Sequence, residues 1–252
     1  MSAWWVLLLA GAGVLAGISG SVGGLASLAS YPALLLAGLA PTAANVTNTV
    51  ALVAITVGAA GGSRPELVGQ GRYIWRLCAV SVLGGASGAA LLLTTPAGVF
   101  EMVVPWLIAG GSVVLLLGPR LRRAFGEHRA GHVGAGMQAA VFLISVYAGY
   151  FGAAAGVLML ALLSAVSQQS LARINAAKNL IMGAANAVAA GTFAVIGPVH
   201  WVAALALGAG SLVGGMLGPR VVRRLPAGPL RVAIGVAGLG LAVKLAVDAG
   251  TF

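Results

Sequence analysis

Residues 16–24 read Ala-Gly-Ile-Ser-Gly-Ser-Val-Gly-Gly and interrupt the first long apolar run of the chain. Gly17, Gly20 and Gly23 give the backbone a freedom that a lipid-facing helix does not use, so we expect a helix break here. A second stretch of this kind, Ala-Gly-Tyr-Phe-Gly-Ala-Ala-Ala-Gly, occupies residues 148–156. Glycine-broken apolar segments at corresponding places in two halves of a chain are typical of a transport site at a repeat interface.

The composition is that of an integral membrane protein. Of the 252 residues, 60% are hydrophobic and only 7% are charged, whereas a soluble domain carries roughly 25% charged residues. The net charge of +10 comes mainly from arginines in short loops beside apolar runs, where the positive-inside rule places them. We therefore expect membrane lipids as the surroundings and no nucleic acid as a partner.

Helix-length apolar segments predict an all-α polytopic membrane protein with eight to ten transmembrane segments. The first two segments of each half are short and share a glycine-rich junction, so they are either full spans or re-entrant half-helices. The segments cover approximately residues 4–18, 22–39, 43–61, 73–93, 101–118, 134–151, 153–168, 172–196, 200–217 and 230–248.

The arginines fix the predicted orientation. With ten segments, the three basic loops fall on one side, and the connections 94–98 and 196–199, which carry no basic residue, fall on the other. Assigning the basic side to the cytoplasm places both termini outside. The basic loops hold Arg64, Arg72 and Arg76, then Arg120, Arg122, Arg123 and Arg129, then Arg220, Arg223, Arg224 and Arg231.

Motifs that recur at a constant offset indicate an internal repeat. The glycine breaks recur 132 residues apart, while Asn45 recurs as Asn175, and Gly84-Gly85-x-x-Gly88 as Gly214-Gly215-x-x-Gly218, 130 residues apart. We predict a first membrane repeat over residues 1–118, a basic cytoplasmic linker over 119–133 and a second membrane repeat over 134–252. The loop charges make these halves inverted repeats. The Gly84/Gly88 and Gly214/Gly218 pairs are spaced for close helix packing.

Lys178 is the least expected residue, because ionisable side chains inside apolar segments are costly and usually functional. It shares a helical face with Asn175, Asn179, Met182 and Asn186. The corresponding segment of the first half carries Asn45, Thr47 and Asn48. A cation that faces several amides and hydroxyls suits a small oxyanion. We therefore expect the two polar faces to close around an anionic solute.

Simpler interpretations of the same residues stay open. Lys178 lies about 9 Å along the helix from Ala172, so its side chain could instead snorkel to the interface or cap a helix. The asparagines could form hydrogen bonds between helices, and the glycines could serve close packing.

Other function classes find less support. Gly17-Ile18-Ser19-Gly20 resembles the nucleophile motif of intramembrane serine proteases, but His128, His132 and His200 lie in or next to loops, where no base is at hand for Ser19. The four acidic residues also lie in loops or at segment ends, so no carboxylate is placed to relay protons or sodium. An anion channel stays an alternative to a transporter. The residues call for no catalytic group, cofactor or metal.

The chain resembles the TauE/SafE family of sulfite and organosulfonate transporters over nearly its whole length. The resemblance lies in residues 17–24 with Tyr31-Pro32, in residues 43–49, in residues 149–156 with 175–179, and in the basic central loop. Ala177 stands where members often have threonine.

This resemblance implies that sulfite, thiosulfate or organosulfonates cross a bacterial inner membrane through a central site between two repeats. A homodimer stays an open alternative. The substrate-binding residues that we predict are Gly17, Ser19, Gly20, Ser21, Gly23, Asn45, Thr47, Asn48, Gly149, Tyr150, Gly152, Asn175, Lys178 and Asn179.

Overall fold

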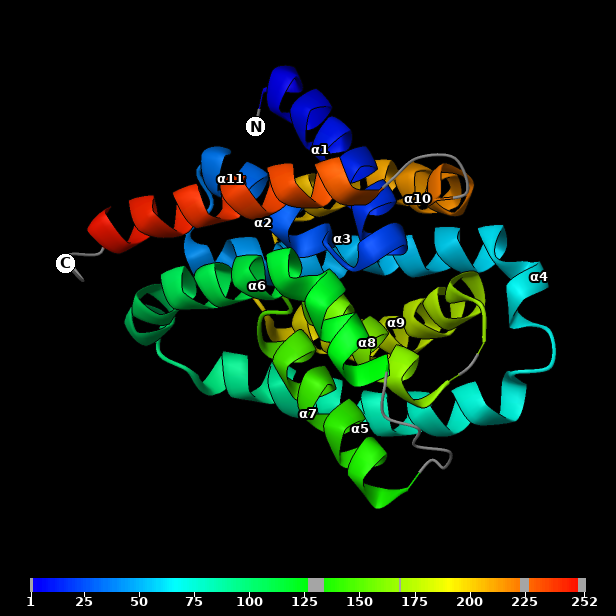
Figure 1. The fold of residues 1–252 in the computed structure, drawn as a ribbon. Coiled ribbons are helices and arrows are strands. Elements are labelled where there is room, and N and C mark those ends of the chain that lie inside the picture. The colour runs from blue at the N-terminus through cyan, green and yellow to red at the C-terminus, as the bar shows by residue number, and fades with distance from the viewer. Residues whose placement is uncertain (1, 127–133, 168, 223–226, 249–252) are drawn as a thin grey trace.

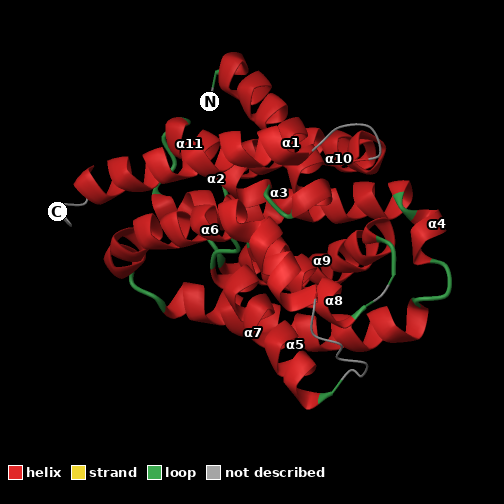
Figure 2. Cartoon of the chain, viewed as in Figure 1, coloured by secondary structure: helices red, strands yellow, loops and turns green. Residues whose placement is uncertain are grey.

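The computed structural model describes residues 2–126, 134–167, 169–222 and 227–248, and within them every regular element is a helix (Figures 1 and 2). The prediction of an all-α protein is therefore confirmed. The helices are α1 (Ala3–Gly23), α2 (Ala26–Leu36), α3 (Pro41–Gly62), α4 (Arg64–Leu67), α5 (Gly71–Thr94), α6 (Ala97–Gly126), α7 (Ala135–Tyr150), α8 (Ala155–Val166), α9 (Leu171–Ile196), α10 (Trp201–Val222) and α11 (Ala227–Asp248).

Six helices in the described part of the chain, α1, α3, α5, α6, α9 and α10, are long and apolar enough to cross a membrane. The protein is thus a polytopic membrane protein. By contrast, α2 has 11 residues and α8 has 12, which at 1.5 Å per residue makes them about 16–18 Å long. The hydrocarbon core of a bilayer is about 30 Å thick. These two helices can therefore cover only half of a membrane span.

The first helix break lies a few residues later than predicted. Helix α1 continues through Gly17 and Gly20 and ends at Gly23, so the expected end near residue 18 is wrong. The chain turns at Gly24, which has a φ of 75° in the left-handed region that favours glycine. The break therefore separates α1 from α2 at the C-terminal edge of the glycine stretch.

The second break lies within the predicted stretch. Helix α7 ends at Tyr150 and α8 begins at Ala155. Gly152 and Ala154 between them have φ values of 77° and 57°. A Cβ atom on Gly156 would lie 2.5 Å from the Cα atom of Gly24. The two breaks therefore meet backbone to backbone, which only a pair of glycines permits.

Glycines outside the breaks serve helix packing. Helix α1 lies along α10, where a Cβ atom on Gly17 would come within 2.7 Å of the Cα atom of Gly214. Helix α7 lies along α5 in the same way, with Gly149 against Gly85. Gly88 also lies against the backbone of α7, so the packing role predicted for these small-residue motifs is confirmed.

Corresponding helices of the two halves run antiparallel. Val46, early in α3, lies by Gly197 just after α9, and Thr56, late in α3, lies by Gly183 in the middle of α9. Helices α6 and α11 pack together in the same opposed sense. In Figure 1, α1, α10 and α11 lie on one side and α5 and α7 on the opposite side, with α8 and α9 between them. This packing supports the inverted repeat, which stays a prediction.

The predicted linker is helical in its first part, since α6 continues to Gly126. Residues 127–133, with Glu127, His128, Arg129 and His132, lie outside the described residues.

Candidate functional site

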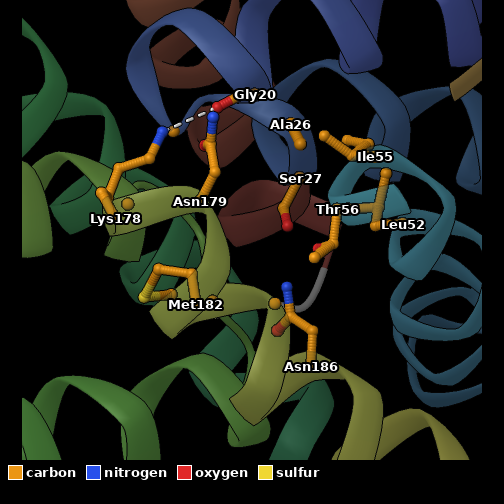
Figure 3. A pocket seen from close by; sticks show the side chains of 14 residues that line it. Gly20, Ala26, Ser27, Leu52, Ile55, Thr56, Lys178, Asn179, Met182 and Asn186 are labelled. Carbon is orange, nitrogen blue, oxygen red and sulfur yellow. Dashed lines mark hydrogen bonds between the residues drawn. The ribbon is translucent and has the colours of Figure 1, made fainter. Parts of the chain in front are cut away.

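A cavity of about 70 Å³ lies where the two helix breaks meet, between α3 and α9 (Figure 3). A water molecule needs roughly 10–15 Å³ of such space, so the cavity has room for a small polyatomic ion. The residues that line it are Gly20, Gly24, Ala26, Ser27, Leu52, Ile55, Thr56, Gly152, Gly156, Lys178, Asn179, Met182, Gly183 and Asn186.

The lining contains residues that correspond between the two halves. At the breaks, Gly20 and Gly24 line the cavity together with their counterparts 132 residues later, Gly152 and Gly156. On the walls, the corresponding pairs at an offset of 130 are Leu52 with Met182 and Thr56 with Asn186. The cavity therefore lies at the interface of the two predicted repeats.

Lys178 is buried at the edge of this cavity, with 1% of its surface exposed. Its Nζ donates a hydrogen bond to the carbonyl oxygen of Gly20, at 3.0 Å. The side chain therefore points inward and caps the end of α1, so the snorkelling alternative is wrong and the helix-capping alternative is confirmed. The last turn of α1 carries a partial negative charge from the helix dipole, which the ammonium group of Lys178 offsets.

Two asparagines of α9 bind the same end of α1. The amide groups of Asn175 and Asn179 both donate to the carbonyl oxygen of Ser21, at 2.6 and 3.1 Å. The alternative of hydrogen bonds between helices is confirmed for these residues. Asn179 also lines the cavity, so one asparagine both caps α1 and faces the proposed site.

The polar residues of the first half are engaged elsewhere. Asn45 donates to the carbonyl oxygen of Tyr150 at 2.8 Å. Asn48 accepts from the hydroxyl of Ser30 at 2.5 Å, and the hydroxyl of Thr47 accepts from the backbone of His200 at 3.0 Å. Asn45, Thr47, Asn48 and Tyr150 do not belong to the cavity lining.

The serines of the first glycine stretch bond to their own helix. The hydroxyl of Ser19 donates to the carbonyl of Ala16, and that of Ser21 to the carbonyl of Ile18. Of the fourteen residues predicted from sequence, the structure brings Gly20, Gly152, Lys178 and Asn179 to the cavity. Those outside the lining are Gly17, Ser19, Ser21, Gly23, Asn45, Thr47, Asn48, Gly149, Tyr150 and Asn175.

Three polar side chains outside the predicted set of binding residues converge on the cavity. Figure 3 shows Ser27, Thr56 and Asn186 directed toward its interior from α2, α3 and α9. Asn186 lies eight residues after Lys178, on the helical face already recognised as polar, so that spacing was the signal. No comparable pattern distinguishes Ser27 or Thr56, because hydroxyl residues in apolar helices commonly bond to their own backbone.

The cavity is electrostatically suited to an anion. Lys178 is the only charged side chain in its lining as described. The N-terminal residues Ala26 and Ser27 of α2 and Gly156 of α8 also face it. Helix N-termini present free N–H groups and a partial positive charge. One ammonium group and two half-helix N-termini therefore converge where the backbone is interrupted.

Comparisons with known proteins point to membrane transport. A family model described as "Sulfite exporter TauE/SafE" matches residues 9–245. A "Probable membrane transporter protein" of Haemophilus influenzae is 24% identical, over 95% of this chain and 94% of its own length. The "Probable membrane transporter protein YfcA" of Escherichia coli K12 is 26% identical, over 93% of this chain and 87% of its own length. No solved structure matches the chain.

Proposed function

We propose that this chain, which belongs to the sulfite exporter TauE/SafE family, carries small sulfur-containing anions across the bacterial inner membrane by alternating access. The family and the relatives are membrane transporters and not enzymes, so the serine-protease alternative for Ser19 is set aside. The anions expected are sulfite, thiosulfate or organosulfonates. A homodimer stays an open alternative.

The buried ammonium group of Lys178 is the observation that carries the proposal. A buried charge is retained only where it is compensated, and here the carbonyl of Gly20 is a weak partner for a full positive charge. An oxyanion in the cavity would supply a stronger one. Asn179, Asn186, Ser27 and Thr56 would donate further hydrogen bonds to it from three sides.

An aromatic cluster beside the cavity supports alternating access over an open channel. The rings of Tyr31 and Phe151 pack edge to face with centroids 5.3 Å apart, and those of Phe100 and Phe151 lie 6.1 Å apart. Tyr31, Phe151 and Ser27 line a second, tighter space, and Ser27 also lines the cavity. The aromatic rings would therefore close one exit while the anion is bound.

Uptake into proteoliposomes tests the proposal. The wild-type chain should accumulate radiolabelled sulfite, thiosulfate or sulfoacetate, and Lys178→Met should lower that uptake about tenfold or more, because a hydrogen bond to a charged group contributes roughly 1.5–3 kcal/mol. Lys178→Arg keeps the charge and should retain part of the uptake.

The control for folding is the thermal stability of each variant, since Lys178 also caps α1. Wild-type protein that moves none of these anions, or Lys178→Met protein that moves them normally, would contradict the proposal. Steady current through a planar bilayer would instead indicate the channel alternative.

A further inference from the structure

Two buried oxygen atoms on α3 have no hydrogen-bond partner among the described residues. They are Oδ1 of Asn45 and Oγ1 of Thr42. The two residues are three apart on one helix, so their side chains share a face. Asn45 is 1% exposed. Leaving such a group unsatisfied costs free energy, and an unseen water or ion is the usual explanation.

Oδ1 of Asn45 lies at the end of the interrupted helix α7, and Thr42 lies one helical turn before Asn45 on α3. The amide nitrogen of Asn45 donates to the carbonyl of Tyr150, the last residue of α7. Because Oδ1 belongs to the same small amide group, it lies next to this helix end. The C-terminus of a helix carries a partial negative charge, and the Tyr150 carbonyl keeps a second lone pair for another ligand.

The corresponding end of α1 binds a cationic side chain. There the ammonium group of Lys178 binds the carbonyl of Gly20. The residue 130 positions earlier, at the matching place on α3, is Asn48, which instead accepts from Ser30. The end of α1 is thus bound by a fixed cation, while the end of α7 is bound by the neutral amide group of Asn45.

We propose that the end of α7 binds a sodium ion, with Oδ1 of Asn45, Oγ1 of Thr42 and the carbonyl oxygen of Tyr150 among its ligands. Oxygen ligands favour hard cations, and half-helix C-termini coordinate sodium in transporters with broken helices. A set without a carboxylate suits a monovalent ion, since calcium and magnesium recruit carboxylates. The site goes beyond the proposed function, because it names a coupling ion and does not depend on which anion is moved.

Sodium binding to the purified full-length protein, measured without any sulfur anion, tests this site. The wild type should bind ²²Na⁺, and its melting temperature should be higher in sodium than in choline at equal ionic strength. Thr42→Val should weaken sodium binding by roughly fivefold, the effect of one lost neutral ligand. Thr42→Ser keeps the hydroxyl and should bind like the wild type.

The valine variant separates a ligand from an idle hydroxyl. If Oγ1 of Thr42 met only a water molecule, Thr42→Val would change the melting temperature equally in sodium and in choline, and the proposal would be overturned. It would also be overturned if the wild type responded identically to both cations. Sodium binding without anion uptake would support the site and contradict the transport proposal, whereas sodium-independent uptake without sodium binding would do the reverse.

Discussion

At the scale of single residues, Gly183 sets the distance between the two walls of the cavity. A Cβ atom there would collide with the side chain of Thr56, and both residues line the cavity. The contact between α3 and α9 thus depends on one residue without a side chain facing one with a branched side chain.

Gly183→Ala should lower the free energy of unfolding by about 1–3 kcal/mol, the usual cost of overpacking a tight contact. Adding Thr56→Ala should recover part of the loss, because two of the three clashing atoms are then gone. Thermal unfolding of both single variants and the double variant checks this coupling. Losses that simply add would contradict the contact.

Lys178 could be predicted from the sequence because a charge inside an apolar helix is rare in any setting. The hydrogen-bond partners of Ser19 and Ser21 could not be predicted. A serine in a helix bonds either to its own backbone or to a ligand, and its position in the sequence is the same in both cases. In the structure both serines bond to their own helix. Ser27 and Thr56 were missed for the same reason.

At the scale of helices, the backbone contact between Gly24 and Gly156 joins the two breaks. We expect Gly156→Ala to abolish anion uptake and to destabilise the protein by about 1–3 kcal/mol, because its Cβ atom would push the breaks apart. Gly191 is the matched control, since a Cβ atom there meets nothing within 4 Å.

Gly191 lies inside α9. Because alanine has a higher helix propensity than glycine, Gly191→Ala should raise the free energy of unfolding by up to about 1 kcal/mol. Uptake and melting temperature of the two variants provide the test. Normal uptake by Gly156→Ala would show that the meeting of the breaks is not needed for function.

If the aromatic cluster closes one exit of the cavity, it should restrict the access of reagents to Ser27. With Cys78, the only cysteine, replaced by serine, a cysteine introduced by Ser27→Cys should resist a membrane-impermeant thiol reagent added from outside. Phe151→Ala removes a ring that packs against both Tyr31 and Phe100 and should expose that cysteine.

Phe193→Ala serves as the control, because Phe193 is fully buried but does not line the cavity. If it exposed the cysteine equally, labelling would reflect a loosened core. Unchanged protection in Phe151→Ala would contradict the role of the cluster as a closed exit.

The two helix breaks could be predicted from the glycine stretches, but the residues at which each helix ends and the next begins could not. Gly17 fits a break as well as it fits close packing, and only the proximity of α10 decides that it packs. The second break is longer, because the chain leaves α7 after Tyr150 and enters α8 at Ala155. Its left-handed Ala154 has no sequence signature.

At the scale of the whole molecule, the proposed transport requires two halves that run in opposite directions, with a shared site between them. The class of protein could be predicted from the sequence because its composition is apolar over the whole chain, while the division into two halves, which rests on loop charges and constant offsets, stays a prediction. A site between the polar faces of α3 and α9 was also expected, but the side chains that line the cavity could not be predicted, because they depend on an antiparallel approach that puts Thr56 beside Gly183.

Anomalous X-ray diffraction from crystals grown with selenite, the selenium analogue of sulfite, shows directly whether the anion binds in the cavity. We expect one strong selenium peak in the cavity, between Thr56 and Asn186 and close enough to Lys178 for a selenite oxygen to accept a hydrogen bond from its Nζ, in a structure whose halves run in opposite directions. A peak away from this cavity, or halves that run in the same direction, would contradict the account.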